Sequence, residues 1–320
     1  MDERKKILDV IKRHHRFLVT SHHNPDADAA ASALSVAIML KTMGKKVTVV
    51  NEDALPKWLE FLPQAKLFKQ AKTVKAFDYD AAIMLDCGDM ERIGGVHKLL
   101  IKGKPNINID HHVTNTLFGD INWIGKETSS TCEMVYDLLA ASRLGLNKPL
   151  AILLYAGIMT DTGSFRYDNA RSKTHAVIAD LMRFGINAQQ MHERLYVGMP
   201  VVDMKLFAKV ISDAQLSHHD KVFCVSLSFQ SSQVFSKSFD LKDKLFGFLR
   251  SVEGIEVVVI LTQINSKEVR INLRSQGAVN VAKIAQLFNG GGHAKAAGGE
   301  MSGSLDDVKK KVLNAIKKAL

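Results

Sequence analysis

Short, continuous apolar runs alternate with longer segments of helical periodicity in the first half of the chain. Four of these runs predict buried strands, at residues 17–21, 47–50, 81–85 and 106–109. Helical patterns lie around them, at residues 3–15, 29–43, 127–144 and 150–160. Since buried strands that alternate with helices form sheets covered on both faces, this half predicts an α/β fold with a mostly parallel sheet flanked by helices.

The pattern changes in the second half of the chain. Residues 182–213 are typical of helix with one break, at Gly198-Met199-Pro200, and three later runs predict strands, at residues 222–227, 256–262 and 268–273. Helical stretches separate these strands, a glycine run at residues 290–292 interrupts the pattern, and an amphipathic helix closes the chain. This order favours a second, smaller α+β domain with a mixed sheet. We therefore divide the chain into a first domain, a helical linker and a second domain, at residues 1–188, 189–214 and 215–320.

Histidine and aspartate side chains stand directly after three of the predicted strands. His22, Asp26 and Asp28 follow the first, Asp86 the third, and Asp110-His111-His112 the fourth. Any one of them could instead cap a helix or stabilise a turn. Because the functional crevice of a parallel sheet lies at the carboxyl ends of its strands, their joint occurrence indicates one shared site. Asp161, at the end of a helical run, is expected to join it.

These residue types are suited to divalent metal ions. Carboxylate oxygens are preferred by Mg²⁺ and Mn²⁺, and added imidazoles move the preference towards Mn²⁺. Two such ions about 4 Å apart can activate a water molecule and stabilise the attacking and leaving oxygens of phosphoryl transfer. The pattern therefore predicts a centre of two divalent ions, of which Mn²⁺ is the first expectation and Mg²⁺ the second.

Charge and cysteine usage add the expected partners and compartment. The formal net charge of +10 and a pI of about 9.4 favour anionic partners, including nucleotides, although lysines also keep proteins soluble. The three cysteines are far apart, which favours neither a disulfide framework nor a thiolate zinc site. The charged start lacks a signal-peptide pattern, and the longest apolar stretch is too short to span a membrane. A cytoplasmic protein without membrane association is the expectation.

Five motifs resemble, in the expected order, those of the DHH phosphoesterase superfamily and its associated DHHA1 domain. They are His22-x-x-Pro25-Asp26-x-Asp28, Leu85-Asp86-Cys87-Gly88-Asp89, Asp110-His111-His112, Thr160-Asp161-Thr162-Gly163-Ser164-Phe165 and, for DHHA1, Gly290-Gly291-Gly292-His293 with Arg274-Ser275 upstream. The resemblance covers nearly the whole chain. It implies a DHH catalytic domain followed by a DHHA1 substrate-binding domain.

The resemblance also implies a role for each residue. The first Mn²⁺ would be bound by His22, Asp26 and Asp86, and the second by Asp28, Asp86, His111 and Asp161, so that Asp86 bridges the two ions. His112 would face the scissile phosphate and act with Asp28 and Asp86 in catalysis. The implied substrate-binding residues are Arg274, Ser275, Gly291, Gly292 and His293.

The chain lacks features of several branches of the superfamily. It has no room for the additional OB-type domain of the single-strand exonucleases, and no transmembrane segment of the membrane-bound branch. The resemblance then implies a Mn²⁺-dependent hydrolase of short single-stranded oligonucleotides (a nano-RNase or oligoribonuclease) and of 3′-phosphoadenosine-5′-phosphate (pAp), acting through a hydroxide activated by two metals. A soluble cyclic di-AMP phosphodiesterase is the alternative, and an exonuclease on long strands or a non-catalytic nucleotide-binding protein stands behind it. A homodimer is also expected.

Overall fold

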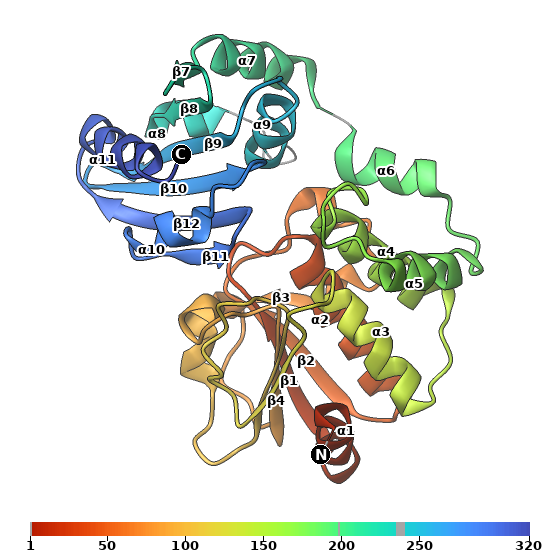
Figure 1. Cartoon of the computed structure of the whole chain (residues 1–320). Helices are drawn as coiled ribbons and strands as arrows, with labels where there is room; N and C mark the ends of the chain where they lie inside the picture. Colours follow the sequence, from red (N-terminus) through yellow and green to blue (C-terminus); the bar gives the residue numbers. More distant parts are fainter. Residues whose placement is uncertain (1, 198, 235–240) are drawn as a thin grey trace. The chain divides into compact units, whose positions relative to one another are not determined.

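The computed structural model describes residues 2–197, 199–234 and 241–320 (Figure 1). These residues form two compact units, Met1–Val197 and Gly198–Leu320, each with its own sheet. The two-domain α/β and α+β organisation predicted from the sequence is thus confirmed. The finer division at residues 188 and 214 stays a prediction.

The first unit is built on a six-stranded sheet in which every strand pair is parallel, in the order β3-β2-β1-β4-β5-β6. Its strands are β1 (Arg16–Ser21), β2 (Lys46–Asn51), β3 (Phe68–Gln70), β4 (Ala81–Leu85), β5 (Asn106–Asp110) and β6 (Ile121–Ile124). The chain runs outward from β1 to β3 and then returns to β4, beside β1. This order places the topological switch point, where α/β proteins bind ligands, between β1 and β4.

Helices cover this sheet, and the structure corrects one prediction about them. They are α1 (Glu3–Arg13), α2 (Ala27–Thr42), α3 (Thr131–Ser142), α4 (Lys148–Asp161), α5 (Ser172–Met182) and α6 (Ala188–Tyr196), with short 3₁₀ segments at Lys57–Leu59, Ala65–Leu67, Ala71–Thr73 and Glu91–Leu99. The single break expected within 182–213 was wrong, because the chain also turns between α5 and α6. Gly185 there has a φ of 73°, and the Asn187 side chain caps α6 by accepting from the N–H of Gln190.

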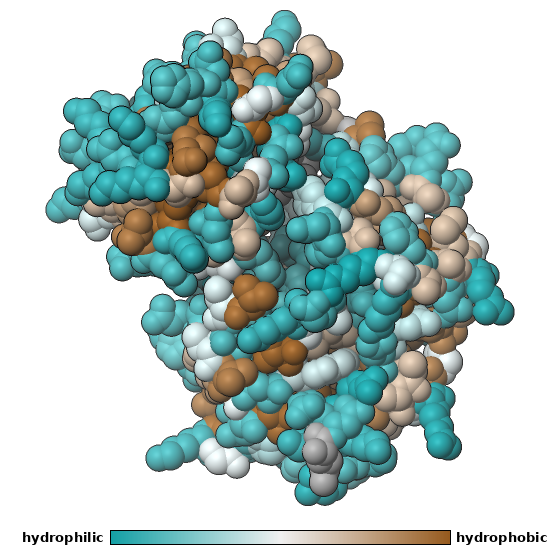
Figure 2. All heavy atoms as spheres, viewed as in Figure 1, coloured by the Kyte–Doolittle hydropathy of each residue, from teal (hydrophilic) through white to brown (hydrophobic). Residues whose placement is uncertain are grey.

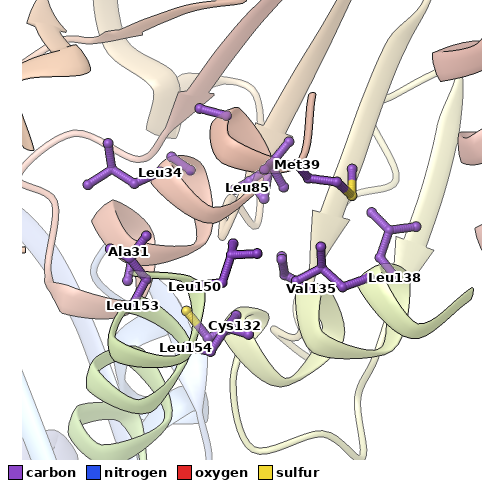
Figure 3. Close-up of a cluster of buried hydrophobic side chains, with 14 of the residues drawn as sticks. Ala31, Leu34, Met39, Leu85, Cys132, Val135, Leu138, Leu150, Leu153 and Leu154 are labelled. Carbon is purple, nitrogen blue, oxygen red and sulfur yellow. The ribbon is translucent and has the colours of Figure 1, made fainter. Parts of the chain in front are cut away.

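The core of the first unit lies between the sheet and three of these helices. Figure 3 shows side chains from α2, α3, α4 and the end of β4 pointing toward one another. Leu34, Leu85 and Leu154 are fully buried there, and burial of each such side chain contributes about 1.5–3 kcal/mol. Helix α2 is apolar on nearly all sides, so even its first turn is enclosed by protein.

The second unit has a mixed six-stranded sheet, in the order β11-β12-β10-β9-β8-β7. All neighbouring pairs are antiparallel except β8 and β9, which are parallel. The strands are β7 (Gln215–Ser217), β8 (Val222–Leu227), β9 (Val257–Asn265), β10 (Glu268–Ser275), β11 (Gly291–His293) and β12 (Ala296–Ser302). The helices are α7 (Val201–Ser212), α8 (Phe229–Val234), α9 (Leu241–Leu249), α10 (Val281–Gln286) and α11 (Leu305–Lys317).

The glycine run of the second unit is part of a hairpin and does not interrupt the sheet as expected. Residues 291–293 form β11, which pairs antiparallel with β12. A Cβ atom at Gly290 would lie 2.0 Å from the carbonyl oxygen of Gly298, and one at Gly292 would lie 2.5 Å from that of Ala296. Glycine is therefore required here by the close approach of two backbones, a cause that sequence alone does not reveal.

The described residues include no helix that is long and apolar enough to cross a membrane. On the face drawn in Figure 2, hydrophilic residues cover most of the surface, and hydrophobic residues appear between them in small groups. Exposed apolar side chains of this kind are ordinary on folded proteins.

Candidate active site

The predicted site residues of the first unit converge at the carboxyl ends of three adjacent strands. β1 leads into His22, β4 into Asp86, and β5 ends at Asp110 and leads into His111 and His112. Two helix ends join them: Asp26 caps α2 and Asp28 lies in its first turn, while Asp161 is the last residue of α4. The shared site expected from the sequence pattern is thus assembled at the switch point of the sheet.

One group of side chains in this site consists of His22, Asp26 and Asp86. Nε2 of His22 lies 3.7 Å from Oδ2 of Asp26 and 3.3 Å from Oδ2 of Asp86. The other ring nitrogen, Nδ1, donates to the carbonyl oxygen of His23 over 2.8 Å. A backbone acceptor at one ring nitrogen is the usual arrangement of a metal-binding histidine, because it directs the second nitrogen to the ion.

A second group lies on the other side of the same carboxylate. Asp28, Asp86 and His111 offer ligand atoms within 4.8 Å of one another, as His22, Asp26 and Asp86 do. Nε2 of His111 lies 3.5 Å from Oδ1 of Asp86 and 3.3 Å from Oδ2 of Asp161. The two oxygens of Asp86 therefore face different histidines. A carboxylate placed in this way can bridge two cations.

His112 is oriented by the strand residue that precedes the histidine pair. Its Nδ1 lies 2.7 Å from Oδ1 of the fully buried Asp110, and Asn115 donates to the second oxygen of that carboxylate over 2.6 Å. Burial disfavours a charged His112 ring, but the carboxylate of Asp110 outweighs burial and raises the pKa of His112 to about 9. Nδ1 of His112 is thus engaged by the protein.

The backbone of Asp86 is strained. Its φ of 59° lies in the left-handed region, which non-glycine residues rarely adopt, and its N–H donates to the carbonyl oxygen of Ile109 over 3.0 Å. Strain of this kind costs on the order of 1–3 kcal/mol and concentrates at functional sites. The strained backbone thus belongs to the residue whose carboxylate lies in the centre of the site.

The electrostatics of the site show an excess of negative charge. Burial works against a charged His22 ring, but Asp26 and Asp86 outweigh burial and raise its pKa to about 10. Burial, with the charges of Asp86 and Asp161 added to it, raises the pKa of Asp28 well above its usual value. Carboxylates this close repel one another unless a cation lies among them. The donor set, oxygens and imidazole nitrogens without a thiolate, fits a divalent ion such as Mn²⁺ or Mg²⁺.

Three polar residues that position the site were missed at the sequence level. Asn51, at the end of β2, donates from Nδ2 to the carbonyl oxygens of Ser21 and His22, over 3.1 and 3.0 Å. Asn115 supports Asp110, and Thr131, at the start of α3, contacts both Asp28 and Asp86. A single asparagine or threonine has many ordinary uses in a fold, so no sequence pattern distinguished them.

The predicted substrate-binding residues of the second unit lie on β10 and β11. Arg274 of β10 has its guanidinium carbon 4.8 Å from the centre of the Phe246 ring, and Gly291, Gly292 and His293 form β11. Ser275 follows Arg274 but points to the opposite face of the strand, where it is only 2% exposed. The substrate-binding role of all five residues stays a prediction.

Comparison with known proteins decides the family. The model of the DHH family N-terminal domain matches residues 16–158, and that of the DHHA1 domain matches residues 234–320. The bifunctional oligoribonuclease and PAP phosphatase NrnA of Thermus thermophilus is 30% identical, over 94% of this chain and 89% of the relative. The chain belongs to the DHH family. Bacillus subtilis NrnA, of the same description, is 26% identical over 92% of this chain and 91% of its own.

A solved structure has the same fold over nearly the whole chain. An exopolyphosphatase-related protein from Bacteroides fragilis superimposes with a TM-score of 0.86 at 25% identity, over 99% of this chain and 96% of its own. As a member of the DHH family, the chain is a phosphoesterase, a hydrolase with acidic and histidine clusters that can bind metal. The strand-end aspartates described above lie within the region matched by the N-terminal DHH model, and Asp161 lies three residues beyond it.

Proposed function

We propose that this protein is a Mn²⁺-dependent hydrolase of very short oligonucleotides and of pAp. The observation that carries the proposal is the position of the Asp86 carboxylate between two groups of ligand atoms, one with His22 and Asp26 and one with Asp28 and His111. The relatives described as oligoribonuclease and PAP phosphatase match over almost the whole chain and suggest the substrates.

Each group would hold one ion, and the protein would supply the geometry. His22, Asp26 and Asp86 would bind the first, and Asp28, Asp86, His111 and Asp161 the second. Two divalent ions provide an activated water molecule and positive charge beside the phosphorus. The chain's own part is to keep the ligands fixed: His22 through the carbonyl of His23, and Asp86 through its strained turn.

His112 would contact the phosphate itself. Because Asp110 engages Nδ1, the ring would meet a phosphate oxygen through Nε2. A hydrogen bond from imidazole to a non-bridging oxygen favours the transition state, in which negative charge is spread over the equatorial oxygens. In the second unit, Arg274 and the Gly291–His293 segment would bind the rest of the substrate, with the guanidinium holding a further phosphate. Ser275, whose side chain is buried on the opposite face of β10, would take part only through its backbone.

The function is tested by turnover of the purified protein with Mn²⁺ on four substrates side by side: pApA, a longer oligoribonucleotide, pAp and cyclic di-AMP. We expect fast hydrolysis of pApA and pAp and slow hydrolysis of the other two. Faster opening of cyclic di-AMP than of pApA would assign the protein to cyclic dinucleotide turnover. Hydrolysis of none of the four by Mn²⁺-loaded protein would contradict the proposal.

Asp86→Ala is the first variant to compare. Removal of the carboxylate shared by both groups should lower kcat by about 10³-fold, equivalent to several kcal/mol of transition-state stabilisation. The fold should remain, because the change also relieves negative charge in the site, and circular dichroism checks this. Full activity of a folded Asp86→Ala protein would rule out the two-ion arrangement.

Arg274→Ala separates binding from chemistry. If Arg274 holds a part of the substrate that does not react, KM should rise by about 10- to 100-fold while kcat changes little. Arg270→Ala is a matched control on the same face of β10, since Arg270 pairs with Glu300 over 2.9 Å. An unchanged KM in Arg274→Ala would remove Arg274 from the binding site.

A further inference from the structure

The start of helix α3 contacts two of the proposed metal ligands at once. Residues 129–133 lead into and begin this helix, and Ser129, Ser130, Thr131 and Glu133 are all at most 1% exposed. Asp28 and Asp86 come from other elements, the first turn of α2 and the end of β4. No part of the sequence pattern had connected α3 with the site.

Asp28 is held by the backbone of this helix. The N–H of Thr131 donates to Oδ2 of Asp28 over 2.7 Å, and the N–H of Cys132 donates to Oδ1 over 2.9 Å. These are two of the N–H groups that a helix leaves without an internal acceptor at its first turn. With one donor on each oxygen, the plane of the carboxylate is fixed, while each oxygen keeps a lone pair for a cation.

Asp86 is held by the side chain of Thr131. The hydroxyl of Thr131 donates to Oδ1 of Asp86 over 3.0 Å, and it does so where Thr131 is fully buried. That oxygen is the one nearest to His111, at 3.5 Å from its Nε2. Thr131 is therefore a single residue that orients the carboxylates on both sides of the second proposed ion.

The position of Thr131 is itself fixed by a buried carboxylate. Glu133 accepts from the hydroxyl of Ser129 over 2.5 Å and from that of Thr174 on α5 over 2.9 Å. Ser130 caps the helix by accepting from the N–H of Glu133 over 3.1 Å. This capping arrangement prevents the first turn of α3 from sliding along or fraying.

We propose that Thr131 is the positioning residue of the metal centre, which sets the orientation of Asp28 and Asp86 before the ions bind. The inference rests on the proposed ligands and adds a residue outside the metal-binding set. Outer hydrogen-bond partners of metal ligands typically contribute 10- to 100-fold in metal affinity. Since Thr131 would act through Asp28 and Asp86, its effect should appear in metal binding and in kcat, but not in KM.

The test is titration of full-length protein with Mn²⁺ by calorimetry, for wild type, Thr131→Val and Thr131→Ser. Valine has the shape of threonine without the hydroxyl, so it should bind Mn²⁺ about 10- to 100-fold more weakly. Serine keeps the donor and should stay within about threefold of wild type. Thr174→Val is the matched control, because it removes a buried hydroxyl that contacts Glu133 and no proposed ligand, while Ser129 still donates to Glu133 and Ser130 still caps α3 to hold Thr131 in place.

Thermal melting of the metal-free variants separates positioning from mere packing. Thr131→Val with a lowered Tm but wild-type Mn²⁺ affinity would overturn the inference, and so would an equal loss of affinity in Thr174→Val. Metal binding does not depend on the substrate chosen. Weaker Mn²⁺ binding in Thr131→Val, with no hydrolysis of the four substrates by wild type, would therefore sustain the inference while contradicting the proposed function.

Discussion

Gly157 shows how little space the site leaves around a single residue. This glycine lies within α4, one turn before Asp161. A Cβ atom added to it would lie 2.3 Å from Sγ of Cys132 and 2.7 Å from Oδ1 of Asp28. Glycine in the middle of a helix is otherwise unfavourable by about 1 kcal/mol relative to alanine. The close packing of α4 against α3 and Asp28 therefore explains why a glycine stands there.

Gly157→Ala should destabilise the protein and disturb Asp28. We expect a loss of about 1–3 kcal/mol from overpacking, together with weaker Mn²⁺ binding, because the methyl group displaces the carboxylate. Gly247→Ala is the matched control: it is also a helical glycine, but a Cβ there meets nothing within 4 Å. That control should melt at the same or a higher temperature. A Gly157→Ala protein as stable as wild type would show that the helices can separate at no cost.

At the residue scale, the grouping of the candidate ligands was predictable, and the residues that hydrogen-bond to them were not. Asp86 and His111 were predicted because unusual residues followed buried strands at one sheet edge. Asn51 and Thr131 were not, because their function depends on which distant backbone or carboxylate they meet, as in the contact of Thr131 with Asp28, 103 residues away. A contact between residues so far apart in the chain cannot be predicted from the local sequence around either of them.

At the scale of elements, the start of β1 is fixed by Asp80, the residue just before β4. Its Oδ2 accepts from the N–H groups of His15 and Arg16, over 3.0 and 2.8 Å. Its Oδ1 accepts from the Arg16 guanidinium over 2.8 Å, and this hydrogen bond holds the pKa of Asp80 well below its usual range. Asp78 and Lys104 extend the ion pairs at this end of the sheet.

Asp80→Asn should lower stability by about 1 kcal/mol near pH 7. A carboxyl group whose pKa is depressed by folding stabilises the native state above its unfolded pKa, about 3.9, and this contribution is lost as the pH falls toward the folded value. The difference in free energy of unfolding between wild type and variant should thus be full at about pH 6–8 and shrink below about pH 4. Urea unfolding at several pH values measures it. A difference that grew toward low pH would contradict this account.

Elements with strong patterns were predicted well, and weak ones were missed. The four buried strands of the first sheet were identified by their apolar runs. β3 and β6 were missed because they are edge strands of three and four residues with no buried position. β12 was missed because its glycines and alanines do not alternate with polar residues. Its place in the sheet comes from pairing with β10 and β11, which is a tertiary effect.

At the scale of the whole molecule, metal should stabilise one unit and not the other. All proposed ligands belong to the unit Met1–Val197. Ligand binding to the native state alone adds stability as RT ln(1 + [L]/Kd), about 2.7 kcal/mol at a concentration of 100 Kd.

The expected homodimer stays a prediction, and light scattering with and without Mn²⁺ would test it in the same samples.

Hydrogen exchange with and without Mn²⁺ measures directly whether the ions stabilise only the first unit. Protection should increase at the ends of β1, β4 and β5 and at the starts of α2 and α3, and exchange in the sheet of the second unit should stay the same. Mg²⁺ in place of Mn²⁺ should give a smaller effect, because imidazoles suit Mn²⁺ better. Equal protection of both units would contradict the confinement of the ligands to one of them.

The left-handed backbone of Asp86 has a consequence for evolution. Its conformation suits glycine better than aspartate, and its carboxylate lies between His22 and His111. Under the proposed function, a laboratory selection for heat resistance alone would no longer maintain this carboxylate as a metal ligand, the common conflict between stability and activity. An aspartate kept at this position despite its backbone strain would then be a mark of selection for catalysis.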